Sequence, residues 1–255
     1  MSKVKQLFPL TSKYDAGWIK KNSLGENVLY NAENISRLTE IKEGMRILDL
    51  ACGKAISSIF FAREFGAEVW AVDSWISASE NYERAKEMEC GDKVFPLKLD
   101  ARELPFAEEF FDAIIVIDSY MYFGTDEKFL PYITRFLKPQ GVIAIADICF
   151  SRKFNFLAEV PPFLREKYRL RWFYVHSLEW WQNLWNRTGL LKIKNAEIAE
   201  QNEFLKKEYI DYFKDSKQID EIAEALIKDE DNLINFFVMT GQKTERAAYL
   251  EKYET

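Results

Sequence analysis

The chain has 255 residues, of which 48% are hydrophobic, and its formal net charge at pH 7 is -6. This length suits one α/β domain with additions, and the apolar fraction suits a large core. The acidic balance argues against a nucleic-acid partner, which would require a basic footprint. Apolar runs are too short to span a bilayer and no signal peptide is evident, so we expect a cytoplasmic protein with no membrane partner.

Cysteine and histidine are too sparse for most metal or disulfide frameworks. The three cysteines are widely spaced, no C-x-x-C motif occurs, and His176 is the only histidine. We therefore expect neither a zinc site nor a disulfide framework, and no bound metal.

Hydrophobic spacing predicts helices and strands in alternation through the first 150 residues. Helical spacing over 27–41 precedes a strand, helix, strand and helix at 45–50, 55–65, 68–72 and 77–89. Further strands are expected at 94–99, 111–117 and 142–146, with a helix at 128–136 and a turn at 139–141. This order indicates an α/β fold with a doubly wound parallel sheet.

The pattern changes after residue 147. Residues 150–176 are aromatic and basic, and Pro161-Pro162 would break a long helix. A helix at 178–186, a strand at 190–196, a helix or helix pair at 201–228 and a last strand at 233–240 follow, before a charged tail at 243–255. No internal repeat or low-complexity linker divides the chain, so we expect one domain.

Two acidic residues mark the candidate site. The segment Asp49-Leu50-Ala51-Cys52-Gly53-Lys54-Ala55 starts at the end of one predicted strand and continues into a tight turn, and Asp73 lies at the end of the next strand. Ligands of open α/β sheets bind outside the carboxyl ends of the strands, so these groups should meet in one crevice. A tight turn with two carboxylates there suggests a nucleoside-type cofactor.

Five ordered segments resemble class I, Rossmann-like S-adenosylmethionine-dependent methyltransferases. Residues 47–53 resemble the first motif of that family, and residues 69–73 resemble its ribose-binding strand. Residues 99–106 resemble the adenine-contacting segment, residues 110–115 the following strand, and residues 137–142 the turn before strand five. The resemblance covers about 42–148, and 176–181 together with the final strand resemble a bacterial small-molecule subgroup.

The resemblance implies a mostly parallel seven-stranded sheet with helices on both faces and an antiparallel last strand. It implies a cofactor, S-adenosylmethionine, with S-adenosylhomocysteine as product, and a small-molecule methyl acceptor. The single domain 1–255 then divides into an N-terminal cap and helix (1–41), a cofactor-binding core (42–148), a substrate-side insertion (149–189), C-terminal strands and helix (190–242) and a tail (243–255).

The implied cofactor contacts are distributed along the ends of the strands. Asp49 can attract an ammonium group, directly or through water, and Asp73 can accept hydrogen bonds from two ribose hydroxyls. Asp100 can accept from an adenine amino group, the Ala101 N–H can donate to a ring nitrogen, and Trp75 can stack on the ring or simply pack. The cofactor-binding residues expected are Tyr14 (a lid, with Trp18), Asp49, Ala51, Gly53, Asp73, Ser74, Trp75, Asp100, Ala101 and Asp118.

The turn departs from the family pattern of three alternating glycines. Ala51 and Ala55 stand at the outer positions, and only Gly53 remains. We expect the fold to survive because alanine is small and most of the turn can use negative φ, while cofactor affinity is lowered. The loss of the outer glycines disfavours a diphosphate-binding fingerprint.

The acceptor side is less defined by the sequence. Tyr122 and His176 are the candidate catalytic residues, since tyrosine can orient an acceptor and histidine titrates near neutrality. Asp118, Ser119 and Tyr120 are neighbours of the same strand end. Trp181 and Trp185 form a packing stripe or a substrate wall. The basic stretch 152–171 forms a solvated face or receives an anionic acceptor, and the oligomeric state is not indicated.

Three alternatives remain beside a small-molecule methyltransferase. One is an RNA or protein methyltransferase, which the acidic charge disfavours. Another is a module that binds S-adenosylmethionine or S-adenosylhomocysteine without catalysis, which the two alanines of the turn motivate. An NAD-dependent oxidoreductase ranks last.

Overall fold

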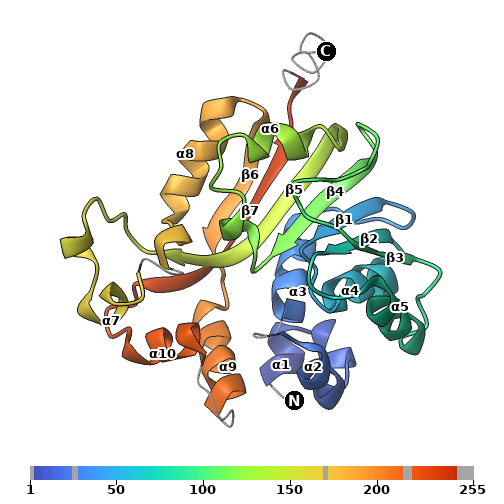
Figure 1. The fold of residues 1–255 in the computed structure, drawn as a ribbon. Helices are drawn as coiled ribbons and strands as arrows, with labels where there is room; N and C mark the ends of the chain where they lie inside the picture. The colour runs from blue at the N-terminus through green and yellow to red at the C-terminus, as the bar shows by residue number, and fades with distance from the viewer. Residues whose placement is uncertain (1–2, 25–27, 169–171, 215–219, 246–255) are drawn as a thin grey trace.

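A computed structural model of the chain describes residues 3–24, 28–168, 172–214 and 220–245, and these contain one seven-stranded sheet (Figure 1). The strand order is β3-β2-β1-β4-β5-β7-β6. Strands β1 to β5 are parallel, and β7 is antiparallel to both β5 and β6. The predicted fold class is therefore confirmed. The strands are β1 (Arg46–Leu50), β2 (Glu68–Asp73), β3 (Val94–Lys98), β4 (Phe111–Ile117), β5 (Leu137–Phe150), β6 (Leu191–Ile198) and β7 (Ile234–Lys243).

Helices cover both faces of the sheet, because alternate residues of each parallel strand point to opposite sides. Leu48, Ile114 and Ile143 belong to one hydrophobic cluster, whereas Ile47 and Ala113 belong to the other. The first cluster takes in α6 and α8, and the second takes in α3, α4 and α5. The helices are α1 (Lys3–Leu7), α2 (Ala16–Asn22), α3 (Val28–Leu38), α4 (Ile56–Phe65), α5 (Ala78–Glu87), α6 (Phe129–Thr134), α7 (Pro162–Arg165), α8 (Leu178–Thr188), α9 (Asn202–Lys214) and α10 (Glu221–Lys228).

Several element boundaries differ from those predicted. β5 begins at Leu137, so the turn expected at 139–141 is an irregularity within one long strand, where Gln140 has a φ of 65°. Its pairing with β4 shifts register between Phe111 and Ala113. The stretch 201–228 contains two helices, α9 and α10, and the aromatic N-terminal residues form α1, a 3-10 turn and α2.

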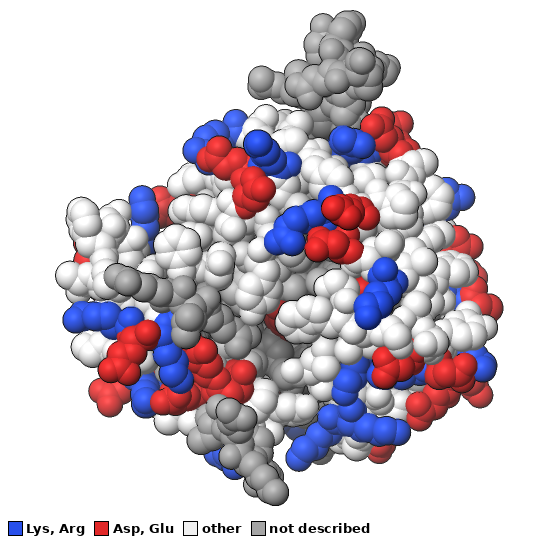
Figure 2. Space-filling model, viewed as in Figure 1, with Lys and Arg blue, Asp and Glu red and all other residues white. Residues whose placement is uncertain are grey.

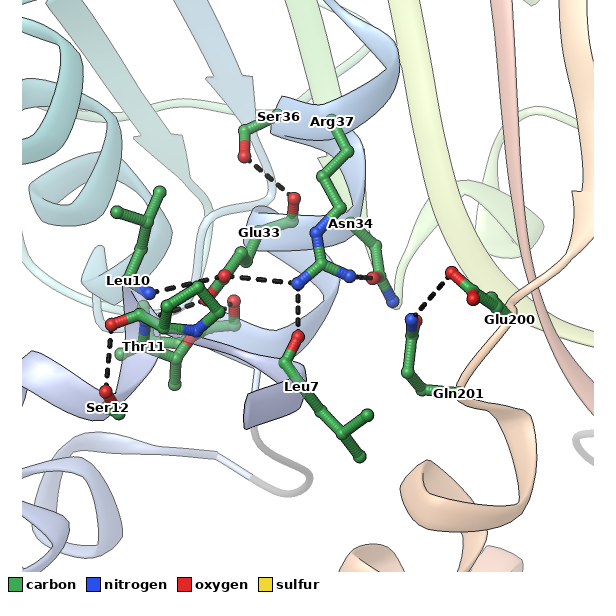
Figure 3. Close-up of polar contacts among 12 residues, drawn as sticks. Leu7, Leu10, Thr11, Ser12, Glu33, Asn34, Ser36, Arg37, Glu200 and Gln201 are labelled. Atoms are coloured by element: carbon green, nitrogen blue, oxygen red, sulfur yellow. Dashed lines mark hydrogen bonds and ion pairs between the residues drawn. The ribbon is translucent and has the colours of Figure 1, made fainter. Parts of the chain in front are cut away.

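One buried carboxylate ties the N-terminal segment to α3. Glu33 is 1% exposed, and its oxygens accept hydrogen bonds from the backbone N–H of Thr11 (2.7 Å) and of Leu10 (3.3 Å). Arg37 pairs with the same carboxylate at 3.2 Å and donates to the carbonyl of Leu7 (Figure 3). The segment before β1 is therefore held against α3 by directed polar contacts as well as apolar packing.

The N-terminal segment also meets the C-terminal half of the chain. The ring of Phe8 lies 5.6 Å from that of Phe204 on α9, and the Tyr30 ring lies 5.3 Å from Phe204. The hydroxyl of Tyr212 on α9 donates to the carbonyl of Lys20 on α2 at 3.4 Å. Two segments far apart in sequence thus face each other below the sheet (Figure 1).

Charged side chains of both signs are interspersed on the face shown in Figure 2, without a large single-sign field. Among the described helices, none is long and apolar enough to cross a membrane.

Candidate functional site

A cavity of about 800 Å³ opens at the carboxyl ends of the central parallel strands. Its walls come from the turn after β1, the ends of β2, β4 and β5, the segment after β3, the end of α2 and the helices α9 and α10. This is where an open α/β sheet places its ligand, as the sequence predicts. The lining residues are Asn22, Ser23, Leu24, Val28, Ala51, Cys52, Gly53, Lys54, Ile56, Val72, Asp73, Ser74, Trp75, Leu99, Asp100, Ala101, Arg102, Ile117, Asp118, Ser119, Met121, Tyr122, Phe123, Asp147, Ile148, Tyr209, Asp220 and Ile222.

The turn between β1 and α4 has left-handed backbone at three positions. Ala51, Gly53 and Ala55 have φ values of 56°, 55° and 58°. The expectation that most of the turn uses negative φ is therefore wrong. Positive φ is steric strain for alanine, because Cβ then approaches the following carbonyl. All three positions thus have the backbone conformation that favours glycine, and Ala51 and Ala55 adopt it at a cost in conformational free energy.

Asp73 connects the end of β2 to this turn. One carboxylate oxygen accepts from the Gly53 N–H at 2.9 Å, and the other accepts from the N–H groups of Trp75 (2.7 Å) and Ile76 (2.9 Å). The residue is 8% exposed and lines the cavity. The oxygen that faces Gly53 has one described donor, so a second lone pair can take a ligand hydroxyl. This geometry fits the ribose contact expected of Asp73.

The segment after β3 supplies the opposite wall of this part of the cavity. Asp100 is half-exposed, accepts from the Arg102 N–H at 2.8 Å, and lies 3.6 Å from the Arg102 guanidinium. Trp75 is 83% exposed although it lines the cavity. An indole left in water at a cavity mouth is suited to stack on a planar ligand. Ala101 and Ser74 line the same region, as expected.

Asp49 is held behind the turn rather than in the cavity. Its carboxylate is 1% exposed and accepts from the hydroxyls of Ser57 and Ser58, both at 2.6 Å. Burial raises its pKa to about 6, while the two serine hydrogen bonds oppose that rise. Asp49 is not among the lining residues, so the structure does not bring it into direct reach of a ligand. Its visible contacts anchor the first turn of α4 to β1.

A polar chain that sequence reasoning missed connects the turn to the N-terminal segment. The Asn81 amide is 1% exposed and donates to the Gly53 carbonyl at 2.9 Å. Arg84 donates to the Asn81 oxygen (2.6 Å) and to the Asn22 oxygen (3.1 Å). Asn22 lines the cavity at the end of α2. These residues have no motif of their own, because their partners are backbone and side-chain atoms distant in sequence.

Tyr14 and Trp18, which the sequence suggested as a lid, do not line the cavity, and other residues of the N-terminal segment do. Tyr14 is buried against Trp18 and Phe60, with ring centroids 6.3 and 6.1 Å away, and it does not line the cavity. Trp18 is not a lining residue either. Asn22, Ser23, Leu24 and Val28 take that place, and 25–27 lie outside the described residues.

Aspartates and tyrosines line the far side of the cavity. Asp118 follows β4 with a φ of 56°, and its N–H donates to Ala146 of β5, which places it beside Asp147 on the neighbouring strand. Asp220, the N-cap of α10, accepts from the Tyr209 hydroxyl at 2.8 Å. Tyr122 is 41% exposed at the rim. Sequence reasoning singled out Asp118 and Tyr122 but missed Asp147, Tyr209 and Asp220.

The structure does not bring His176 to the cavity. Its ring stacks on Trp180 at 3.7 Å and meets Trp181 edge-on at 5.8 Å. Burial lowers its pKa to about 4, so the ring is neutral at pH 7. Tyr120 is also a packing residue, since its ring is fully buried among Trp181, Trp185 and Phe129. The two tryptophans are the packing stripe, not a substrate wall.

The described cations of the stretch 152–168 do not line the cavity. Arg165 donates to the Val160 carbonyl at 3.0 Å, Lys167 pairs with Glu224 at 2.7 Å, and Arg152 donates to the Glu159 carbonyl at 3.3 Å. None of these three lines the cavity, whereas Arg169 and Arg171 lie outside the described residues. The described part of this stretch therefore fits a solvated face.

Comparison with known proteins finds similarity to methyltransferases over part of the chain. The methyltransferase domain family matches residues 47–141. "Methyltransferase GfsG" of Streptomyces halstedii is 29% identical over 119 residues, which are 46% of this chain and 42% of that protein. "O-methyltransferase resE" of Aspergillus sclerotiorum is 28% identical over 168 residues, 62% of this chain and 59% of that protein. The chain thus spans about half the length of these relatives, and its likeness to the methyltransferase domain family lies in residues 47–141.

Solved structures agree on the fold over nearly the whole chain. Phosphoethanolamine N-methyltransferase 2 of Haemonchus contortus superposes with a TM-score of 0.70 at 21% identity, covering 95% of this chain and 60% of that one. The [4+2]-cyclase SpnF superposes with a TM-score of 0.67 at 16% identity, covering 94% of this chain and 95% of that one. The fold is therefore that of class I methyltransferases, and the presence of a cyclase among its neighbours means that the fold alone does not determine the reaction.

Proposed function

We propose that the protein is an S-adenosylmethionine-dependent methyltransferase that acts on a small molecule. The observation that carries the proposal is Asp73, whose carboxylate lies at the end of β2, joins the glycine of the β1–α4 turn at 2.9 Å and lines the cavity. Two aspartates and an exposed indole around one turn suit an adenosine group. The methyltransferase match over 47–141 supports the same assignment.

A role in binding the cofactor can be proposed for individual residues of the cavity. Asp73 would accept from the ribose, Asp100 and the Ala101 N–H would meet the adenine edge, and Trp75 would cover its face. Ala51, Gly53, Ser74 and Asp118 would line the path of the methionine part, and Asp49 would act from behind the turn by positioning α4. When bound, the cofactor supplies an electrophilic methyl group on a sulfonium.

The chain's own contribution to the reaction would be to position the acceptor and exclude water. Alignment of two reactants supplies much of the acceleration of a displacement reaction. The N-terminal segment and α9–α10 close the cavity from two sides, and Tyr122 at the rim would orient the acceptor. A proton acceptor is required only if the attacking atom must lose a proton.

Calorimetric titration with S-adenosylmethionine, S-adenosylhomocysteine and NAD tests the proposal. Asp73→Ala is a poor variant for this purpose, because three backbone N–H groups would lose their hydrogen-bond acceptor and the fold itself would be destabilised. Trp75→Ala is better because the indole is exposed, and Tyr82→Ala, an exposed aromatic on α5, is the matched control.

We expect both adenosyl compounds to bind, Trp75→Ala to weaken them by about 1–3 kcal/mol, and Tyr82→Ala to leave them unchanged. Tight binding of NAD with no response to the adenosyl compounds would refute the proposal. Binding of both compounds without turnover of any metabolite in a broad extract would favour a non-catalytic module, or a different reaction on the same fold.

A further inference from the structure

We infer that the methyl acceptor carries an extended apolar body with aromatic rings, and that this body lies outside the cavity on a row of aromatic side chains. The aromatic row consists of Tyr122, Tyr174, Phe173 and Tyr168. This inference rests on the proposed function, because it names the substrate class of the same cavity. It comes from the ring contacts, the exposure and the anchoring of these side chains.

The aromatic row is a continuous series of ring contacts that begins in the cavity wall. Tyr122 lines the cavity, and its ring centroid lies 6.4 Å from that of Tyr174 at an interplanar angle of 61°. Phe173 lies 5.8 Å from Tyr174 at 81°, and Tyr168 lies 6.4 Å from Phe173 at 86°. A ligand that extends out of the cavity beside Tyr122 therefore meets aromatic rings in succession.

Three rings of the aromatic row are open to solvent. The exposed fractions are 41% for Tyr122, 37% for Tyr174 and 59% for Phe173. Single exposed apolar side chains are ordinary, whereas contiguous aromatic surface at the mouth of a cavity is typical of a ligand-binding site. An apolar ligand that covers these rings is stabilised, because apolar surface of both partners leaves water.

Buried neighbours hold the middle of the aromatic row in position. Its two middle rings belong to the 3-10 turn Trp172–Tyr174. On either side of these rings, Trp172 and Val175 are 1% and 2% exposed. Trp172 also stacks on Phe150, the last residue of β5, with ring centroids 6.0 Å apart. The turn is thus anchored to the sheet, so little conformational entropy is lost when a ligand covers its outward rings.

The cavity wall around Tyr122 is also rich in apolar side chains. Met121 and Phe123, which flank Tyr122 in the chain, are lining residues, and so is Ile148. The Met121 N–H donates to the Asp147 carboxylate at 3.4 Å, so the part of β5 that carries Ile148 lies beside Met121. An acceptor with its reactive group in the cavity would therefore keep apolar contacts through the mouth and onto the aromatic row.

Continuity with the cavity selects the occupant of the aromatic row. The row begins at a residue that lines the cavity, so a molecule that fills the cavity and extends beyond it reaches the row directly. A second copy of the chain or a lipid surface would cover the outer rings without requiring the link through Tyr174 to Tyr122. The experiment below separates these occupants.

The test uses ligands that share one hydroxyl group and differ in their apolar body. Phenol, 2-naphthol and 4-phenylphenol are titrated by calorimetry into the protein saturated with S-adenosylhomocysteine. We expect the affinity to rise with the size of the apolar body. 4-Phenylphenol should bind at least about tenfold more tightly than phenol, because burial of a second ring contributes that factor or more.

Two variants of the aromatic row locate the source of this advantage. Phe173→Ala and Tyr174→Ala should each reduce the advantage of 4-phenylphenol over phenol to about threefold or less, because the second ring loses its aromatic contact. Tyr82→Ala is the matched control, since Tyr82 is 43% exposed on α5 and lies outside both the cavity lining and the row. It should leave the advantage unchanged.

Four outcomes would overturn the inference. Phenol and 4-phenylphenol bind with equal affinity, or the advantage of 4-phenylphenol persists in both Phe173→Ala and Tyr174→Ala. Sedimentation shows a dimer that Phe173→Ala converts to a monomer, which would assign the row to a second copy of the chain. The protein binds phosphatidylcholine vesicles and Phe173→Ala abolishes that binding, which would assign the row to a lipid surface.

Failure of the inference and failure of the proposed function give different results. If S-adenosylhomocysteine binds and 4-phenylphenol has no advantage over phenol, the proposed function stands and the acceptor class is wrong. If S-adenosylhomocysteine does not bind the unmodified protein, the proposed function falls, and the inference falls with it.

Discussion

Replacing Ala51 with glycine should stabilise the protein, although glycine usually destabilises a fold. Ala51 and Ala55 have φ values of 56° and 58°, in the left-handed region. That conformation costs an alanine about 1–2 kcal/mol because Cβ crowds the following carbonyl. Glycine removes this cost but makes the unfolded chain freer, which offsets about 0.4–1 kcal/mol.

The two positions should respond differently because their burial differs. Ala51 is partly buried, so Ala51→Gly loses less packing than Ala55→Gly and should raise the free energy of unfolding by about 0.5–1 kcal/mol. Ala55 is fully buried at the start of α4, and Ala55→Gly also loses a methyl group worth about 0.8 kcal/mol. We expect that variant to be close to neutral.

Ala62→Gly provides the control, since Ala62 is buried inside α4. It should lower the free energy of unfolding by about 2 kcal/mol through lost helix propensity and a lost methyl group. Chemical denaturation with a constant m-value measures all three variants. A loss of stability in Ala51→Gly that equals the loss in Ala62→Gly would refute the account of strain in the turn.

Three further predictions concern stability and pH. Glu33→Gln should lower the free energy of unfolding by about 1–2 kcal/mol, because a buried carboxylate holds two backbone N–H groups and Arg37; an unchanged melting temperature would contradict this. Burial lowers the pKa of His176 to about 4, so the folded state resists protonation of this ring. The contribution of the neutral ring to the free energy of unfolding is present above pH 6.5 and is lost as the pH falls toward 4. His176→Phe should flatten the dependence of stability on pH in that range, and an unchanged slope would argue against burial of the ring. Asn81→Leu should lower the free energy of unfolding by about 1–3 kcal/mol, because the Gly53 carbonyl loses its donor, and should weaken the binding of S-adenosylhomocysteine. Unchanged binding would show that Asn81 does not support the site.

The parts of the site that lie directly after strands could be predicted from the sequence. Asp73 and Asp118 each end an apolar run, and parallel strands bring their carboxyl ends to one edge. Local pattern therefore located these two residues in the cavity wall. The same reasoning placed Asp49 in the cavity, where the structure instead buries it against two serines of α4.

Contacts between distant segments could not be predicted in this way. Asp220 reaches the cavity because α10 lies beneath the sheet (Figure 1), and Asn22, which also lines it, is linked to the β1–α4 turn through Arg84 and Asn81. His176 attracted attention as the only histidine, yet its neighbours Trp180 and Trp181 enclose it. That a residue type occurs once in a sequence does not indicate whether its side chain lines a cavity.

The sequence by itself determined the sheet, its helices and the strand ends that carry Asp73 and Asp100, because periodic burial and strand-end chemistry are local properties. Only the tertiary structure decided the backbone of the β1–α4 turn, the burial of Asp49 and the presence of Tyr209 and Asp220 in the cavity wall. Those features depend on which distant side chains meet, and on strain that the surrounding contacts impose on two alanines.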